Sequence, residues 1–193
     1  MRKIVLVIFA ILLLCSVSAY SQTERWDEKN YIYSNFEYGF SWSMPSDVEW
    51  KKISGTEKHT VFKIRQPDTQ ITAFVNANPI ENMNADVWDS YERMIQQHKE
   101  ADISIEQMSG IKTLNHAFKK CLFCGQHAIK SYSHTSMFDD RCNEPIEVIG
   151  ITYWYAKNGY IYAVSVKTHK QVYDFVGDFM AELFKGYSII NRK

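Results

Sequence analysis

Two cysteines and a histidine stand close together in the segment KKCLFCGQH, residues 119–127. Cys121 and Cys124 have the C-x-x-C spacing, His127 follows Cys124 after two residues, and Cys142 lies further along the chain. Thiol–disulfide exchange centres and zinc sites both use cysteines at this spacing, because it brings two sulfur atoms close together. The same cysteines also suit a structural disulfide, so three interpretations of this segment have to be compared.

The first 21 residues bear on that comparison, because they have the pattern of a secretory signal peptide. Two basic residues come first, residues 4–14 are an unbroken apolar run, and small residues follow. The run is about half as long as the roughly 20 residues that a membrane-spanning helix needs. We therefore predict cleavage after Ala19 or Ser21 and export of the remaining chain, to the periplasm or the medium, with no stable membrane span.

The remaining chain is expected to form one domain. We predict a signal peptide over residues 1–21, a polar lead-in over residues 22–30 and a single globular domain over residues 31–193. Lipid anchoring through Cys15 is less favoured, because Leu14 stands where the lipoprotein pattern has a small residue.

Charge argues against one class of partner. The full chain has 22 basic and 22 acidic residues, and the predicted cleavage removes Arg2 and Lys3. No basic stripe or tail remains that could neutralise phosphates along a nucleic acid, so nucleic acid is not expected as a partner.

A structural disulfide is the favoured interpretation of the cysteines. Exported proteins meet an oxidising compartment in which thiols tend to pair. Cys142 is expected to pair with Cys121 or with Cys124, and closing a loop of about 20 residues would stabilise the fold by roughly 3 kcal/mol in the chain-entropy model.

Two alternatives remain, a thiol-redox centre and a zinc site. A reactive C-x-x-C usually opens a helix, whose dipole stabilises the thiolate, but the residues after Gly125 alternate as in a strand. Zinc prefers four tetrahedral ligands, and the candidates are Cys121, Cys124, His127 and Cys142. Only one C-x-x-C pair is present, so the zinc pattern is incomplete.

Little else in the chain resembles an active site. It has no G-x-S-x-G elbow and no phosphate-binding glycine loop. No cofactor is expected, and we predict that the protein is not an enzyme. Aromatic residues are abundant, and Trp26, Tyr31 and Tyr33 are the candidates for lining a ligand groove.

Hydrophobic periodicity outlines the elements that must position these residues. Alternation predicts strands over residues 36–44, 60–66, 71–77, 126–137, 146–156 and 160–168. Asn158 and Gly159 predict a tight hairpin between the last two of them.

Spacings of three and four predict two helices. The first covers residues 87–98 with Asn84 as its N-cap. Thr168 opens the second in a capping box with Gln171, and Gly186 ends it. Apolar positions on the second helix, expected to face the core, are Val172, Phe175, Val176, Phe179, Met180, Leu183 and Phe184.

The strand over residues 146–156 indicates how the layers are arranged. Tyr153, Trp154 and Tyr155 are consecutive, so large aromatic side chains point to both faces of the sheet. A sheet covered on both sides accommodates them best. We therefore predict the α+β class, as an α/β/α sandwich with a central antiparallel sheet and helices on both faces.

The order of these elements resembles the PsbP-like superfamily, which includes the extrinsic PsbP protein of photosystem II and a nuclear-transport factor that binds the GTPase Ran. The segments YSNFEYGFSWSMPSDVEW and YIYAVSV and the closing helix carry the resemblance, which spans residues 31–190. It implies the α/β/α sandwich and a binding or accessory role. No residue matches those that bind a photosystem or Ran, so no site is implied.

Together these features predict an exported, non-catalytic domain that binds a protein partner or a small ligand. The alternative is a thiol-redox or zinc-binding protein centred on Cys121, Cys124 and Cys142.

Overall fold

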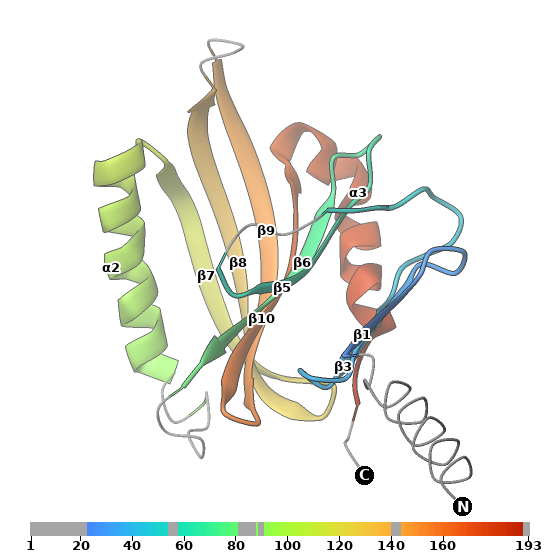
Figure 1. The fold of residues 1–193 in the computed structure, drawn as a ribbon. Coiled ribbons are helices and arrows are strands. Elements are labelled where there is room, and N and C mark those ends of the chain that lie inside the picture. The colour runs from blue at the N-terminus through green and yellow to red at the C-terminus, as the bar shows by residue number, and fades with distance from the viewer. Residues whose placement is uncertain (1–22, 54–57, 81–87, 89–90, 140–143, 191–193) are drawn as a thin grey trace, which may run out of the picture.

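The computed structural model describes residues 23–53, 58–80, 88, 91–139 and 144–190. Figure 1 shows the long helices of the described chain beside a large twisted sheet. The strands of the first half are β1 (Glu24–Asp27), β2 (Ile32–Asn35), β3 (Phe40–Ser43), β4 (Lys51–Lys52), β5 (Thr60–Arg65) and β6 (Thr72–Pro79). The elements of the second half are α2 (Tyr91–Ser109), β7 (Lys112–Phe123), β8 (Gln126–Asp139), β9 (Glu144–Lys157), β10 (Tyr160–His169), α3 (Lys170–Leu183), the 3-10 turn η1 (Phe184–Gly186) and β11 (Tyr187–Ile189).

The strands form two antiparallel sheets. The larger has the order β4-β5-β6-β10-β9-β8-β7, and the smaller has the order β1-β2-β3-β11. The smaller sheet takes three strands from the start of the described chain and one from its far end. β1 lies within the segment expected to be a polar lead-in.

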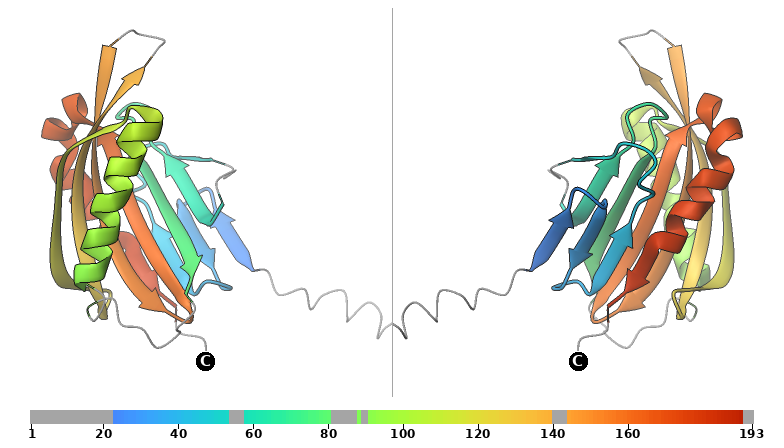
Figure 2. Two further views of the ribbon diagram at one scale, coloured as in Figure 1. Left: turned by 90° about the vertical axis from the view of Figure 1, so that its left-hand side faces the viewer. Right: turned by 90° about the vertical axis from the view of Figure 1, so that its right-hand side faces the viewer.

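The main core fills the space between one face of the large sheet, the small sheet and α3. Alternate residues of β10, such as Tyr162, Val164 and Val166, point into it together with Trp42 of the small sheet and Leu183 of α3. This face is therefore covered by a helix and by a second sheet, as Figure 2 shows from two sides.

The opposite face carries a smaller buried cluster under α2. Met94 of α2 and Ile129 of β8 form its centre, and Phe118 and Trp154 pack against them. Trp154 lies in this cluster whereas its neighbour Tyr155 lies in the main core, because successive strand residues point to opposite faces.

The α+β class is confirmed, but the α/β/α sandwich with helices on both faces is not confirmed in that form. The sequence predicted one central sheet, and the structure has two, with the small sheet taking a large share of one face. Among the described residues, no helix is both long and apolar enough to cross a membrane.

The small sheet corrects the strand predicted over residues 36–44. Those residues alternate correctly, but the chain turns at residues 36–39 and forms a hairpin between β2 and β3. Gly39 has a φ of +71°, which glycine adopts without steric cost. Phe36 is consequently exposed at the turn instead of buried in a strand.

The two helices also begin elsewhere than predicted. α2 extends to Ser109, well beyond residue 98, and Asn84 and Val87 lie outside the described residues. The N-cap of α3 is His169 without a side-chain cap bond, so the capping box of Thr168 and Gln171 is wrong. The Thr168 hydroxyl instead donates to the Thr69 carbonyl at 2.9 Å, which ties β10 to the β5–β6 turn.

The other end of α3 makes a close backbone approach to the small sheet. α3 ends at Leu183, and Gly186 follows at the end of η1. A Cβ atom at Gly186 would overlap the carbonyl oxygen of Ser43, so this position accepts only glycine without backbone movement.

Candidate functional site

The C-x-x-C segment forms a tight hairpin turn. β7 and β8 are joined by Cys124 and Gly125, with Phe123 opposite Gln126. The two turn residues have φ angles of +48° and +76°, the combination of a type I′ turn. The Asn158–Gly159 hairpin, with +51° and +80°, has the same geometry and confirms its prediction.

Both cysteines of this hairpin are free, Cys121 is partly buried and Cys124 is exposed. The Cys124 thiol donates a hydrogen bond to the Tyr187 carbonyl at 3.3 Å, and Cys121 packs against the main core. Burial raises the pKa of both thiols above the usual value. The backbone of Lys130 and the charges of Lys130 and Lys119 favour the Cys121 thiolate, but burial outweighs them. The thiol-redox alternative therefore gains no support.

The structure does not bring His127 to the cysteines. The ring of His127 stacks on that of Trp88, with 3.8 Å between centroids and 2° between planes. His127 and Cys121 point to opposite faces of the sheet, because Cys121 lies opposite Ala128. Among the described residues, no group of three or more His, Cys, Asp or Glu side chains is arranged to hold a metal ion.

Cys142 lies outside the described residues, so its pairing with Cys121 or Cys124 remains a prediction. The strand residues on either side of it, Asp139 and Glu144, pair with each other. β8 separates that pair from the Cys124 turn, and 14 strand residues span roughly 45 Å. The placement of these flanking residues therefore argues against an intrachain bridge.

The aromatic groove suggested for the N-terminal region is absent from the part of the chain that the structure describes. Tyr33 is fully buried, and its hydroxyl donates to a Glu24 carboxylate oxygen at 2.6 Å. Burial raises its pKa well above the usual value. Trp26 and Tyr31 are partly buried and pack against the main core. These three residues are structural.

A second cluster of titratable residues lies between α2 and β7. The Nδ1 of His116 is 2.9 Å from an Asp102 carboxylate oxygen, and the His98 ring lies edge-on to His116 with 5.6 Å between centroids. Burial and the nearby His116 lower the pKa of His98. Among the described residues, no Ser, Thr or Cys side chain is seen in contact with this cluster. Its contacts join α2 to β7 of the sheet.

A cavity lies where β10 ends and α3 begins. Its volume is about 490 Å³, and its lining residues are Glu144, Pro145, Ile146, Glu147, His169, Lys170 and Gln171. The pairing of β10 with β9 ends at His169 opposite Val148. The residues of β9 before Val148 therefore extend beyond the end of β10. We call this cavity the notch.

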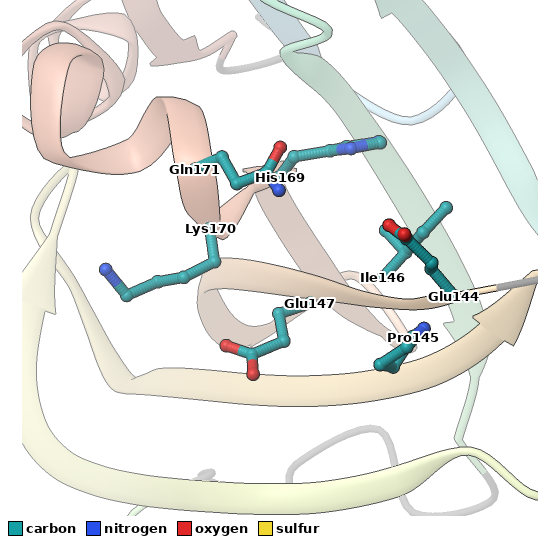
Figure 3. A pocket seen from close by; sticks show the side chains of 7 residues that line it. All are labelled: Glu144, Pro145, Ile146, Glu147, His169, Lys170 and Gln171. Carbon is teal, nitrogen blue, oxygen red and sulfur yellow. The ribbon is translucent and has the colours of Figure 1, made fainter. Parts of the chain in front are cut away.

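Figure 3 shows that the notch has charged groups on both sides of β9. Glu144 and the His169 ring lie on one side, and Glu147 and Lys170 lie on the other. A Glu147 carboxylate oxygen lies 2.7 Å from His134 Nε2, and the Lys170 ammonium donates to an Asp174 carboxylate oxygen at 3.0 Å. The hydrogen bond to Asp174 raises the pKa of Lys170, so the lysine stays charged.

An exposed aromatic side chain lies one helical turn from the notch. Phe175 is 89 % exposed, and it is four residues after Gln171, so the two share one face of α3. The sequence placed Phe175 in the apolar stripe of the helix, which is wrong. The stripe that faces the core comprises Val176, Met180 and Leu183, and Phe175 lies beside it.

Comparisons with known proteins support the fold and no more. No protein-family model and no curated protein matches the chain. The solution structure of the cyanobacterial PsbP, CyanoP, from Synechocystis sp. PCC 6803 aligns with a TM-score of 0.53 and 13 % identity, over 82 % of this chain and 91 % of that one. LpqN of Mycobacterium tuberculosis, described as involved in cell envelope biogenesis, aligns with a TM-score of 0.48 and 10 % identity, over 79 % of this chain and 83 % of that one. The PsbP-like resemblance is thus confirmed at the level of the fold.

Proposed function

We propose that this chain is an exported, non-catalytic domain that binds a partner protein through the notch and Phe175. The observation that carries the proposal is the 89 % exposure of Phe175 beside a cavity lined by charges of both signs. Burying a phenylalanine side chain contributes roughly 2 kcal/mol, and aromatic anchors dominate many protein interfaces. The charged rim would fix the orientation of the partner.

Several features support the non-catalytic part of the proposal. The two described cysteines have raised pKa values, and the histidine with a shifted pKa, His98, packs among aromatic rings under α2. The PsbP-like fold is used as a scaffold, so function has to come from the surface of this particular chain. Turnover of a chromogenic ester or phosphate substrate by the purified protein would contradict this part.

Export is tested directly by N-terminal sequencing. The protein recovered from outside the cytoplasm should begin after Ala19 or after Ser21, because the residues before these positions have the signal-peptide pattern. Recovery of the uncleaved chain in the cytoplasm would overturn the export proposal and leave the binding proposal to its own test.

Partner binding is tested by photo-crosslinking from α3 in the producing cells. A photoreactive amino acid at Gln171 should give a discrete adduct that the same group at Glu182 does not give, since Glu182 is exposed at the far end of the helix. Adducts are detected by gel shift and identified by mass spectrometry.

The change Phe175→Ala should remove most of that adduct and weaken binding by roughly 30-fold if the ring is buried in the complex. Met108→Ala is the matched control, because Met108 is 80 % exposed on α2 away from the notch. Equal crosslinking from both positions, or an adduct unchanged in the Phe175→Ala protein, would contradict the proposal.

A further inference from the structure

A row of basic side chains crosses the face of the large sheet opposite the main core. Lys51 of β4 lies opposite Arg65 of β5, Arg65 lies opposite Thr72 of β6, and Thr72 lies opposite Lys167 of β10. Residues directly opposite in neighbouring strands point to the same face. Arg65 and Lys167 therefore flank the small neutral Thr72 at a Cα separation of roughly 10 Å, twice the strand spacing.

A second row lies next to the first. Lys63 of β5 is opposite Phe74, and Phe74 is opposite Ser165 of β10. The Lys167 ammonium lies 5.1 Å from the centre of the Phe74 ring, so the two side chains form a cation–π interaction.

These rows form a cavity of about 290 Å³ that we call the basic pocket. Its lining residues are Lys63, Arg65, Gln70, Thr72, Phe74, Val148, Lys167, Thr168 and His169. The volume is close to that of small-molecule sites, roughly 300 Å³ and above. None of its described lining residues is acidic. The acidic residues around it are Glu144 and Glu147, which line the notch that shares His169 with this pocket, and Asp68, which accepts a hydrogen bond from Gln66.

A glycine gives the pocket part of its shape. Gly150 of β9 lies opposite Lys167, and a Cβ atom at Gly150 would be 2.8 Å from Ser133 Oγ and 3.3 Å from Lys167 Cγ. Lys167 can therefore lie flat across the sheet at this position. A larger residue at position 150 would push the lysine stem away from the sheet.

The rim of the pocket is held by a network of hydrogen bonds. The Thr168 hydroxyl donates to the Thr69 carbonyl at 2.9 Å, and the Gln66 side chain accepts from the Thr69 hydroxyl at 2.7 Å. Both Thr168 and Gln66 are buried. The turn between β5 and β6 is thereby fixed against the end of β10, so the basic side chains project from a rigid base.

We infer that the basic pocket binds a small ligand through a phosphate group, with Arg65 and Lys167 as its main contacts. The guanidinium fork of Arg65 matches two phosphate oxygens, and Lys63 on β5 and Lys167 on β10 supply point charges from the two sides of β6. Three cations from the two strands that flank β6 suit a dianion better than a single carboxylate. The source of the phosphate is either a free phosphate ester or the headgroup of an anionic lipid. This inference goes beyond the proposed partner site and does not depend on Phe175.

The test is a titration of the mature protein followed by NMR of backbone amides in β5, β6 and β10. The probes are inorganic phosphate, glycerol phosphate and acetate, each at low and at physiological salt, with phosphatidic acid vesicles against phosphatidylcholine vesicles as the lipid arm. We expect saturable shifts with both phosphate probes that weaken as salt rises. Binding of glycerol phosphate in solution assigns a free ester, whereas binding to phosphatidic acid vesicles alone assigns a headgroup.

Substitutions decide whether the pocket is responsible. Arg65→Gln and Lys167→Gln should each weaken phosphate binding about tenfold or more, because each removes a charge-assisted contact. Gly150→Ala should weaken it as well by displacing Lys167. Lys185→Gln is the matched control, since Lys185 is an exposed lysine paired with Glu182 at the other end of α3.

Two results would overturn the inference. One is the absence of saturable shifts with either phosphate probe and with phosphatidic acid vesicles. The other is binding that acetate matches or that Arg65→Gln and Lys167→Gln leave unchanged while circular dichroism shows both variants folded. Phe175→Ala should leave phosphate binding intact, so a failed partner site and a failed basic pocket are distinguishable.

Discussion

Cys124 adopts a left-handed backbone conformation and directs its thiol to the Tyr187 carbonyl. These two facts indicate that the second cysteine of the C-x-x-C motif has a structural role in a turn. The first cysteine packs against the core, the second occupies the apex of a turn, and the histidine after them stacks on Trp88. The C-x-x-C spacing brings two thiols and a nearby histidine together only if the backbone between them has a suitable conformation. The type I′ turn in this segment directs these side chains apart.

The first prediction concerns thiol reactivity. Cys121 and Cys124 should be recovered as free thiols after alkylation without reduction, and both should react slowly at pH 7 because burial raises their pKa values. Peptide mapping by mass spectrometry gives the sites, and the reaction rate should rise with pH up to and beyond the usual thiol pKa. A disulfide that links either residue to Cys142 would refute this prediction.

The second prediction concerns the protonation of His98. Its pKa is lowered in the folded state, so the unfolded chain binds more protons there and stability must fall as pH drops below about 6.5, the usual histidine pKa. The protection factors of α2 amides, which correct hydrogen exchange for its intrinsic pH dependence, should fall between pH 7.5 and pH 5.5, since the His98 ring packs against Trp154 and Phe118.

His98→Gln is expected to reduce this pH dependence, because glutamine does not titrate. His134→Gln is the control, as His134 lies on β8 beside Glu147 and away from α2. An α2 exchange profile with the same pH dependence in wild type and in His98→Gln would count against the assignment.

The two hairpin turns offer a comparison at the scale of elements. Cys124–Gly125 and Asn158–Gly159 have the same geometry, but asparagine tolerates the left-handed region better than other side chains. Cys124→Asn should therefore stabilise the protein, by up to about 1 kcal/mol once the lost contact of the thiol with Tyr187 is subtracted. Urea unfolding measures the change, and a destabilised variant would show that the thiol contact outweighs the backbone strain.

Sequence periodicity predicted some of the strands and hairpins correctly and missed others. The hairpin of β9 and β10 and the strand nature of β8 could be read from alternation and from Asn158–Gly159, because these signals are local. The β2–β3 hairpin could not, because Phe36 continues the alternation across a turn that Gly39 makes possible.

The same holds for the candidate sites. Phe175 has the spacing of a core position, and only the packing of α3 shows that it is exposed. The basic pocket depends on the register of β5, β6 and β10. Lys63 and Arg65 are two residues apart on β5, but Lys167 lies 102 residues after Arg65, and no local sequence pattern predicts that Lys167 shares their face.

At the scale of the whole molecule, stability depends on the contact region between the two sheets around Trp42, which we call the joint. Trp42 is fully buried there, and its indole N–H donates to the Leu183 carbonyl at 2.8 Å. Its ring contacts Phe62 of the large sheet and Tyr187 of β11. One side chain thus links both sheets and the end of α3.

Trp42→Phe should lower the free energy of unfolding by about 1–3 kcal/mol, because it leaves the Leu183 carbonyl without its donor and opens space in the core. Trp50→Phe is the comparison, since the Trp50 indole donates within its own segment to the Pro45 carbonyl at 2.9 Å. Guanidinium unfolding of both variants measures the difference. A Trp42→Phe protein as stable as wild type would mean that the joint tolerates the change.

The pairing of β11 with β3 has a consequence for biosynthesis. Trp42 and its acceptor Leu183 are 141 positions apart, and β3 gains its second strand only through Tyr187–Ile189. A nascent chain therefore cannot close its core until residue 189 has left the ribosome. Under the proposal that the chain is exported, this late closure keeps it unfolded through synthesis, in the state that a secretion channel accepts.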